Sequence, residues 1–411
     1  MQNCFIKLFK LQEFRIESSE LKDNKMLITV SPKIRGVRCR DCGRYITTVN
    51  RHIKPKKVKH MFWQNNLIIL LVKTRAFFCW QCQKKDKRRH ITVDRLKSIP
   101  LNKNYSLIYA DQIMRGLGST CFKTQQELAN SSFSTIQKIL SDRIDPFVGI
   151  WPNSQNDKDE PIVSLGLDCH SFSGHKMLPT ITDISNHKLI SVLPDDKRKT
   201  VERFLDNMPE SHRKTVREVC IDLSRDYYRT IQKKLPEALI VADAFHVVAD
   251  ANRRVSDLRT TIQKADKVKL PKIIFDKSKE KLNPNQRVAL NEINKAYPEL
   301  FELWRYKEEL RRIYKIPNKT LAEISFNSMI KRMRLSRSEV TKQWLKTLMR
   351  WRDEILNYFE RFTTNGYTEG VNTKLKTIKR LSYGFRNIDN YIRKVMLSFI
   401  PISLLLSHYL T

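Results

Sequence analysis

Residues 163–193, VSLGLDCHSFSGHKMLPTITDISNHKLISVL, contain the pattern that decides the fold. Val163, Leu165 and Leu167 recur with a period of two, which is typical of a strand with one buried face, and this strand ends at Asp168. Turn-forming residues at 174–175 and 185–187 divide the rest of the stretch. The stretch therefore predicts a three-stranded meander.

The following residues predict that this sheet continues. A helix is expected over 200–208, a strand over 216–221, a second helix over 224–235 and an apolar strand over 238–242. The order is βββαβαβ, which indicates an α/β domain.

From residue 251 to about 361 the apolar residues recur at helical spacing and no strand is expected. One such stripe consists of Trp344, Leu348, Trp351, Ile355 and Phe359. A continuous apolar stripe favours a helical core over aromatic platforms for nucleobases. Asn365-Gly366 then breaks the chain, and a basic helix is expected over 368–380.

Eight cysteines occur in the chain, and four of them form the pairs Cys39/Cys42 and Cys79/Cys82. Two CxxC pairs supply the four thiolates of a tetrahedral Zn²⁺ site, and a strand-like run over 66–73 lies between them. The alternative is two unrelated thiol pairs.

Between the cysteine region and the meander, residues 124–129, 130–133 and 134–140 predict a helix, a turn and a second helix capped by Ser134. The second helix is a candidate for the DNA major groove, although short capped hairpins are also common in protein cores. The polar stretch 153–160 indicates a linker.

These patterns predict a multidomain α/β protein with five parts. They are a zinc-binding part at 1–100, a helix-turn-helix at 101–148, a first catalytic part at 160–250, an all-helical insertion at 251–362, and a final helix with a closing segment at 363–411.

Charge favours a polyanionic partner. Lys and Arg number 77 against 43 acidic residues, a formal net charge of +34, and the basic residues are spread along the whole chain. Such an excess favours nucleic acid over a membrane surface. We find no secretory signal and no apolar run of spanning length, so a cytoplasmic location without membrane attachment is expected.

Three carboxylates occupy positions that suggest a common site. Asp168 ends the first strand, Asp222 ends the fourth, and Glu369 begins the helix after the insertion. Each position also suits ordinary turn or capping chemistry. Asp226 is a competitor for the second position.

The fifth strand ends in Asp243, with His246 close behind, and these two residues are accessory candidates. Asp243 also competes with Asp222 for the role of second acid.

Crowded carboxylates repel each other unless cations join them, and Mg²⁺ or Mn²⁺ prefers oxygen ligands. Two such ions about 3.5–4 Å apart activate an attacking oxygen and stabilise the leaving oxygen at a phosphodiester. The chain has only ten Gly and no convincing nucleophile elbow or phosphate-binding glycine loop. Metal-dependent DNA cleavage and joining is the chemistry that fits.

Four segments resemble the ISL-three family of insertion-sequence transposases: 165–168 (LGLD), 220–227 (CIDLSRDY), 241–248 (VADAFHVV) and 365–372 (NGYTEGVN). The resemblance covers nearly the whole chain. It implies an RNase H-like catalytic fold with a helical insertion before the last acid.

The same resemblance implies that Asp168, Asp222 and Glu369 form the acidic triad and that the four paired cysteines bind zinc. One departure is Cys169, because the family usually has an acid after the first aspartate. A neighbouring strand residue points to the opposite face, so little effect on metal binding is expected.

The sequence thus predicts a DDE-type transposase that binds the terminal inverted repeats of its element and target DNA, as a homodimer or larger assembly on DNA. The alternatives are an inactive zinc and helix-turn-helix DNA-binding protein, and a two-metal nuclease that does not join strands.

Overall fold

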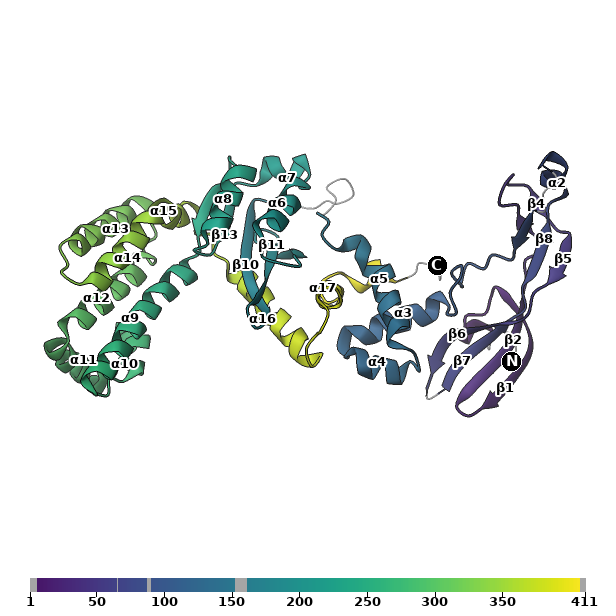
Figure 1. The fold of residues 1–411 in the computed structure, drawn as a ribbon, viewed down its shortest axis with the longest axis horizontal. Helices are drawn as coiled ribbons and strands as arrows, with labels where there is room; N and C mark the ends of the chain where they lie inside the picture. The colour runs from purple at the N-terminus through teal and green to yellow at the C-terminus, as the bar shows by residue number, and fades with distance from the viewer. Residues whose placement is uncertain (1–5, 65, 87–89, 152–160, 407–411) are drawn as a thin grey trace. The chain divides into compact units, whose positions relative to one another are not determined.

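The computed structural model describes residues 6–64, 66–86, 90–151 and 161–406. The chain forms two compact units, and unit 1 is built from two segments that flank unit 2 in sequence (Figure 1). Unit 1 consists of Met1–Val148 and Ile378–Thr411, and unit 2 of Gly149–Thr377. Residues 378–406 therefore pack with the N-terminal part of the chain, whereas the sequence predicted a single segment from 363 to the end. The finer five-part division stays a prediction.

Unit 1 contains a four-stranded sheet of order β1-β2-β7-β6. The strands are β1 (Phe14–Lys22), β2 (Lys25–Pro32), β6 (Lys56–Trp63) and β7 (Asn66–Val72). Strand β7 pairs with β2 in parallel and with β6 in antiparallel orientation. Phe14, Ile28, Val58 and Leu70 are fully buried in its core. Only β7 was predicted from the sequence.

The paired cysteines lie among short elements of the same unit. These are β3 (Val37–Arg38), β4 (Tyr45–Ile46), β5 (Val49–His52), β8 (Arg75–Phe78), α2 (Trp80–Asp86) and β9 (Ile91–Val93). Strand β8 lies between β5 and β9 in a three-stranded sheet. Cys39, Cys79 and Cys82 share a small apolar cluster with Phe77 and Ile46, so the cysteines are part of this region's core.

A helical group completes unit 1. Its members are α3 (Leu107–Ser119), α4 (Phe122–Leu128), α5 (Phe133–Ile144), η1 (Asp145–Phe147), α17 (Ile388–Leu397) and α18 (Ile402–Leu405). The two helices predicted here are present as α4 and α5. The predicted cap was wrong: the Ser132 side chain accepts the Thr135 N–H, and Ser134 lies inside the helix.

Helix α17 contacts α5 and α3, although more than 240 residues of chain separate them from it. Arg393 on α17 donates to both oxygens of Asp145 at 2.6 and 2.9 Å. Lys394, which is buried, donates to the Thr120 carbonyl at 2.8 Å. These contacts explain why the end of the chain belongs to unit 1.

Unit 2 is built on a five-stranded sheet of order β12-β11-β10-β13-β14. The strands are β10 (Ser164–Ser173), β11 (Lys176–Asp183), β12 (Lys188–Val192), β13 (Glu218–Ile221) and β14 (Leu239–Ala242). The first three form the predicted antiparallel meander, and β13 and β14 continue in parallel from β10. The observed β10 runs past Asp168 to Ser173, further than predicted.

The side chains of β10 alternate between an apolar face, which packs into the core, and a face that carries Gly166 and Asp168. Leu165 and Leu167 pack into an apolar core. This core includes residues of α6 (Arg198–Asp206), α8 (Arg225–Lys234) and the stretch after α7 (Glu210–Thr215). Helix α7 was not predicted, and it leaves β13 starting at Glu218 instead of Val216. Gly166 and Asp168 point to the opposite face.

Between β14 and the last helix of unit 2 the described chain is entirely helical, as predicted. The helices are α9 (Ala244–Asp266), α10 (Lys272–Asp276), η2 (Lys279–Lys281), α11 (Pro284–Ala296), α12 (Pro298–Ile313), α13 (Lys319–Arg334), α14 (Glu339–Arg350) and α15 (Arg352–Arg361). All five residues of the predicted stripe from Trp344 to Phe359 are at most 3% exposed, so they are core residues.

Helix α15 returns the chain to the sheet, where the Asn357 side chain donates to the Ile240 carbonyl of β14 at 2.9 Å. Helix α16 (Gly366–Leu381) follows and crosses the sheet at its start (Figure 1). No helix among the described residues is long and apolar enough to cross a membrane.

Candidate active site

Two of the predicted acids lie next to each other because their strands are parallel neighbours. In the register of β10 and β13, Leu167 is opposite Ile221. Asp168 is the next residue of β10 and Asp222 directly follows β13, so both carboxylates lie at the C-terminal end of β13. Asp226, the competing candidate, is exposed in the first turn of α8.

Gly166 lets helix α16 approach the strand that carries Asp168. A Cβ at this position would lie 2.2 Å from Thr368 Oγ1 and 2.7 Å from Asn365 Oδ1. Any larger residue would push the start of α16 away from the sheet. The first turn of this helix carries Glu369.

Asn365 fixes the start of α16 against the ends of three strands. It is fully buried, and its side-chain N–H groups face the carbonyls of Leu167 and Cys220 at 3.4 Å each. Its backbone N–H donates to Asp243 Oδ1 at 3.1 Å. One residue thereby connects β10, β13 and the end of β14 to the helix of the third acid.

Asn372, one turn beyond Glu369, holds Asp168 in place. Its Nδ2 donates to Asp168 Oδ2 at 2.9 Å, and its Oδ1 accepts from Thr180 Oγ1 of β11 at 2.6 Å. The other Asp168 oxygen accepts the Cys169 N–H at 2.7 Å. Both Asn372 and Asp168 are buried, so these bonds define one orientation of the carboxylate.

The accessory candidates are part of the same cluster. Asp243 is 1% exposed, and its Oδ2 bonds to His246 Nδ1 at 2.9 Å. The other His246 nitrogen lies 3.8 Å from Asp168 Oδ1. Both Asp243 oxygens therefore have hydrogen-bond partners, Asn365 and His246. Asp222 has fewer, because among the described residues its Oδ1 accepts only the Ser224 N–H.

The electrostatics of the cluster favour a bound cation. Burial raises the pKa of Asp168, of Asp222 and of Glu369, and neighbouring carboxylates raise them further. The bond to Asp243 raises the pKa of His246, because the imidazolium is stabilised by the surrounding acids. Buried and half-buried acids that resist ionisation together are ordinary ligands for a divalent metal.

A side-chain oxygen of Glu369 is also available to a cation. Its Oε1 is buried and has no hydrogen-bond partner in the described structure. The ligand atoms of Asp243, His246 and Glu369 lie within 4.8 Å of one another, whereas Asp168, Asp222 and Glu369 do not meet this distance as a set. The structure thus brings all five residues into one cluster, with Glu369 nearest the accessory pair.

The four paired cysteines converge in unit 1. Their Sγ atoms all lie within 4.8 Å of one another, with Cys39 to Cys82 and Cys42 to Cys79 both at 3.8 Å. Backbone N–H groups of Cys42 and Asp41 outweigh the opposing effect of burial and lower the pKa of Cys39 to about 7. His90 bonds to Asp41 at 2.6 Å beside the cluster. The arrangement suits a tetrahedral metal ion.

Comparison with known proteins gives the family. The family model described as "Transposase", for the ISL-three group of DDE transposases, matches residues 165–395, which is more than half of the chain. The chain belongs to the ISL-three family of DDE transposases. This transposase is 22% identical over 396 residues to the transposase of insertion sequence element IS1001 from Bordetella parapertussis, covering 94% of each chain.

A second relative of the transposase is that of insertion sequence element IS1557 from Mycobacterium tuberculosis, 22% identical over 70% of each chain. Among solved structures, the Drosophila P element transposase strand transfer complex aligns at a TM-score of 0.40 and 12% identity, over 70% of this chain and 91% of that one. The transposase is an enzyme of the DDE type, it acts in DNA transposition, and DNA is its partner.

Asn365 and Asn372 of this transposase were not predicted as site residues, although both lie in the segment 365–372 that carries the family resemblance. Asn365 was interpreted as part of a chain break, although it directly precedes helix α16 and holds the start of that helix against the strands. The available signal was spacing. Asn365, Thr368 and Asn372 recur at intervals of three and four, so a helix that begins at 366 turns these polar side chains to one face.

Proposed function

We propose that this transposase cuts and joins DNA strands at a site where Asp168, Asp222 and Glu369 hold divalent metal, either Mg²⁺ or Mn²⁺. The observation that carries the proposal is the juxtaposition of Asp168 and Asp222 on neighbouring parallel strands, with the unpartnered Glu369 Oε1 on the helix that crosses them. When bound, such ions activate the attacking oxygen and stabilise the leaving oxygen of a phosphodiester.

An RNase H-like fold for unit 2 is supported by the sheet itself. A three-stranded antiparallel meander extended by two parallel strands, with an acid on the central strand and another on its neighbour, is the topology that the family resemblance implies. The helical insertion precedes α16, so the third acid arrives only after the insertion is complete.

The residues of the cluster have separate roles in this proposal. Asn372 orients Asp168 and keeps its Oδ2 accepting an N–H, which favours the ionised form. Asp243 and Asn365 fix the start of α16 and therefore the position of Glu369. His246 lies between Asp243 and Asp168, and its bond to Asp243 raises its pKa, so these acids favour the imidazolium form that partly offsets their negative charge.

We also propose that unit 1 binds the terminal inverted repeats of the element and that Cys39, Cys42, Cys79 and Cys82 hold a structural Zn²⁺. Thiolates about 2.3 Å from one ion at tetrahedral angles are ~3.8 Å apart. The two printed Sγ distances agree with this value. Helix α5, with Lys138 and Ser134 exposed, is the proposed major-groove helix.

The test uses the full chain, DNA carrying an end of the element that encodes it, and Mg²⁺ or Mn²⁺. The variants are the near-isosteric Asp168→Asn, Asp222→Asn, Asp243→Asn and Glu369→Gln. We expect wild type to cut and join, and the first, second and fourth variants to bind the end without cutting. Loss in Asp243→Asn with activity retained in Asp222→Asn would reassign the second acid to Asp243.

The same assay separates the other functions. Cutting in which the freed 3′-hydroxyl never attacks a second duplex would indicate a nuclease, and end binding by wild type without cutting would indicate an inactive DNA-binding protein. Joining requires two ends, so we propose a homodimer or larger assembly on DNA. Mass measurement of the complex checks it, and a single chain on a joined end pair would contradict it.

A further inference from the structure

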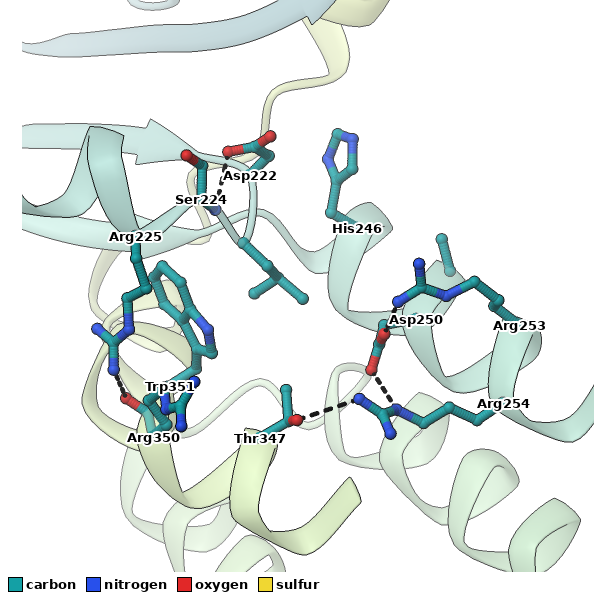
Figure 2. Close-up of a pocket in the computed structure, with 12 residues that line it drawn as sticks. Asp222, Ser224, Arg225, His246, Asp250, Arg253, Arg254, Thr347, Arg350 and Trp351 are labelled. Atoms are coloured by element: carbon teal, nitrogen blue, oxygen red, sulfur yellow. Dashed lines mark hydrogen bonds and ion pairs between the residues drawn. The ribbon is translucent and has the colours of Figure 1, made fainter. Parts of the chain in front are cut away.

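A pocket of about 500 Å³ lies in unit 2 beside the carboxylate cluster. Figure 2 shows Asp222, Ser224 and His246 along one side of it and Arg254 and Thr347 on the opposite side. The first group comes from the end of β13 and the start of α9, while Thr347, Arg350 and Trp351 come from the end of the helical insertion. The size lies within the ~300–1,000 Å³ range of pockets that hold small ligands or parts of larger ones.

Positive charge dominates this pocket, in contrast to the neighbouring acids. Its lining includes four arginines, Arg225, Arg253, Arg254 and Arg350, and two carboxylates, Asp222 and Asp250. We call the pocket lined by these four arginines the arginine pocket. Asp250 is already paired with Arg253 and Arg254, the latter at 2.7 Å. The pocket therefore keeps a surplus of cationic groups next to the acidic end of the sheet.

Two of the arginines are held rigidly. Arg254 bonds to Asp250 and also donates to Thr347 Oγ1 at 3.1 Å, which connects α9 to α14. Arg225 lies over the ring of Trp351, 4.5 Å from its centroid, and donates to the Arg350 carbonyl at 3.0 Å. Figure 2 shows both contacts on the pocket wall. Fixed guanidinium groups lose little freedom when they bind an anion.

Arg350 differs from the others because its guanidinium has no hydrogen-bond or ion-pair partner among the described residues. It is exposed and lines the pocket from the last residue of α14. Arg350 is thus available to a ligand from solution.

We propose that the arginine pocket binds a backbone phosphate of the DNA strand, on a nucleotide adjacent to the phosphodiester at Asp222. The proposal rests on the function proposed above. Guanidinium groups bind phosphate oxygens through two parallel N–H bonds. The neighbouring carboxylates repel phosphate wherever no metal intervenes, so the strand needs cationic contacts on each side of the reacting position. The helical insertion supplies Arg253, Arg254 and Arg350, and α8 supplies Arg225.

The test measures DNA binding by the full chain, not cleavage. The affinity of Arg350→Ala for a duplex carrying the element end is compared with that of wild type, in the presence of Mg²⁺ or Mn²⁺ and over a range of salt concentrations. We expect binding to weaken roughly tenfold, as for a charge-assisted bond, and the slope of log affinity against log salt to fall by ~0.9 for one lost phosphate contact. Arg350→Lys should recover the slope but only part of the affinity.

Arg334→Ala is the matched control. Arg334 is an exposed arginine at the end of α13, in the same insertion, and it does not line the pocket. A second series replaces single phosphates near the cleavage position by neutral methylphosphonates. One of these should weaken binding by wild type and by Arg334→Ala, yet have no further effect on Arg350→Ala, because both changes remove the same contact.

An unchanged salt slope in Arg350→Ala, or purely additive effects at every phosphate, would overturn the proposal. Failure of the proposed function is a different result, in which wild type binds but never cuts while the coupling between Arg350 and one phosphate persists. Unfolding curves of the variants identify any general loss of structure, which is not expected for an exposed side chain.

Discussion

Asn372 Nδ2 lies 2.9 Å from Asp168 Oδ2, which joins helix α16 to strand β10 across 204 residues of sequence. The bond places an uncharged donor behind a carboxylate that is proposed to bind metal. A ligand oriented in this way by a neighbour presents its remaining lone pairs in a fixed direction. Several outcomes depend on that relationship and on the other contacts of the two units.

Asn372→Ala should raise the Mn²⁺ concentration needed for half-maximal cleavage by about 10–100-fold, the usual effect of removing a partner of a metal ligand. The reason is that Asp168 loses the bond that lowers its pKa and fixes its orientation. Thr377→Ala, at an exposed position on the same helix, is the control. A fall in activity with an unchanged metal requirement would contradict an orienting role.

Asp243→Asn and Asp222→Asn should have opposite effects on stability at pH 7 without metal. Asp243 is buried with both oxygens bonded, to the Asn365 N–H and to His246 Nδ1, so an amide there keeps only one oxygen for two contacts and loses the charge that pairs with His246, at a cost of roughly 3 kcal/mol of unfolding free energy. Burial raises the pKa of Asp222, so its ionised form opposes folding above the unfolded pKa, and Asn removes that cost. Denaturant unfolding measures both, and a less stable Asp222→Asn would be the contrary result.

The purified chain should contain about one Zn²⁺, and Cys42→Ser should lose it. Cys121→Ser is the matched control, because the Cys121 side chain caps α4 by accepting the Thr124 N–H and serine performs this role well. Elemental analysis of the dialysed proteins provides the measurement. Equal zinc contents in the two variants would show that the cysteine cluster is not the zinc site.

His60 should remain neutral in the folded chain down to about pH 4. Burial lowers its pKa to about 4, against the opposing hydrogen bond to the Phe9 carbonyl at 2.7 Å. Below the unfolded value of ~6.5 only the unfolded chain takes up the proton, so this residue lowers stability as pH falls from 6.5 to 4, by at most ~1.4 kcal/mol per pH unit. Mass-spectrometric exchange of the ring C–H reports the pKa, and a value near 6.5 would refute this.

Tyr391→Ala should destabilise unit 1, although this residue follows helix α16 of unit 2 in sequence. Tyr391 is fully buried on α17, with its ring centroid 5.3 Å from that of Phe385. Removing a buried aromatic side chain costs about 3–5 kcal/mol. Tyr383, which is 92% exposed, provides the matched control Tyr383→Ala. Weakened binding of end DNA in Tyr391→Ala but not in Tyr383→Ala would support the proposed role of unit 1. Equal stabilities of the two variants would contradict the predicted contribution of Tyr391 to packing.

The elements of unit 2 could be predicted because their periodicity is local. The alternation of Leu165 and Leu167 and the helical stripe from Trp344 to Phe359 each record which face is buried. A common site for Asp168 and Asp222 was suggested by their positions at the ends of the first and fourth expected strands. In contrast, β1 and β2 were not predicted. Only one residue of β1, Phe14, is buried, so its two faces differ too little in polarity to give a pattern.

Contacts between distant segments were the other part that could not be predicted. The bonds of Asn365 and Asn372 to the strands depend on where α16 crosses the sheet, and no local sequence pattern predicts that position. The same holds for α17 on α5, and for Ser132 as the cap, where two serines within three residues make equally good candidates.

The contact between α17 and α5 also determines when unit 1 can finish folding during synthesis. Helices α3 to α5 emerge from the ribosome early, but their partner α17 is translated only after every acid of the cluster. A chain that stops prematurely therefore has an unfinished unit 1. If unit 1 binds DNA as proposed, aborted translation products would lack the completed binding surface and would not compete with longer chains for the ends of the element.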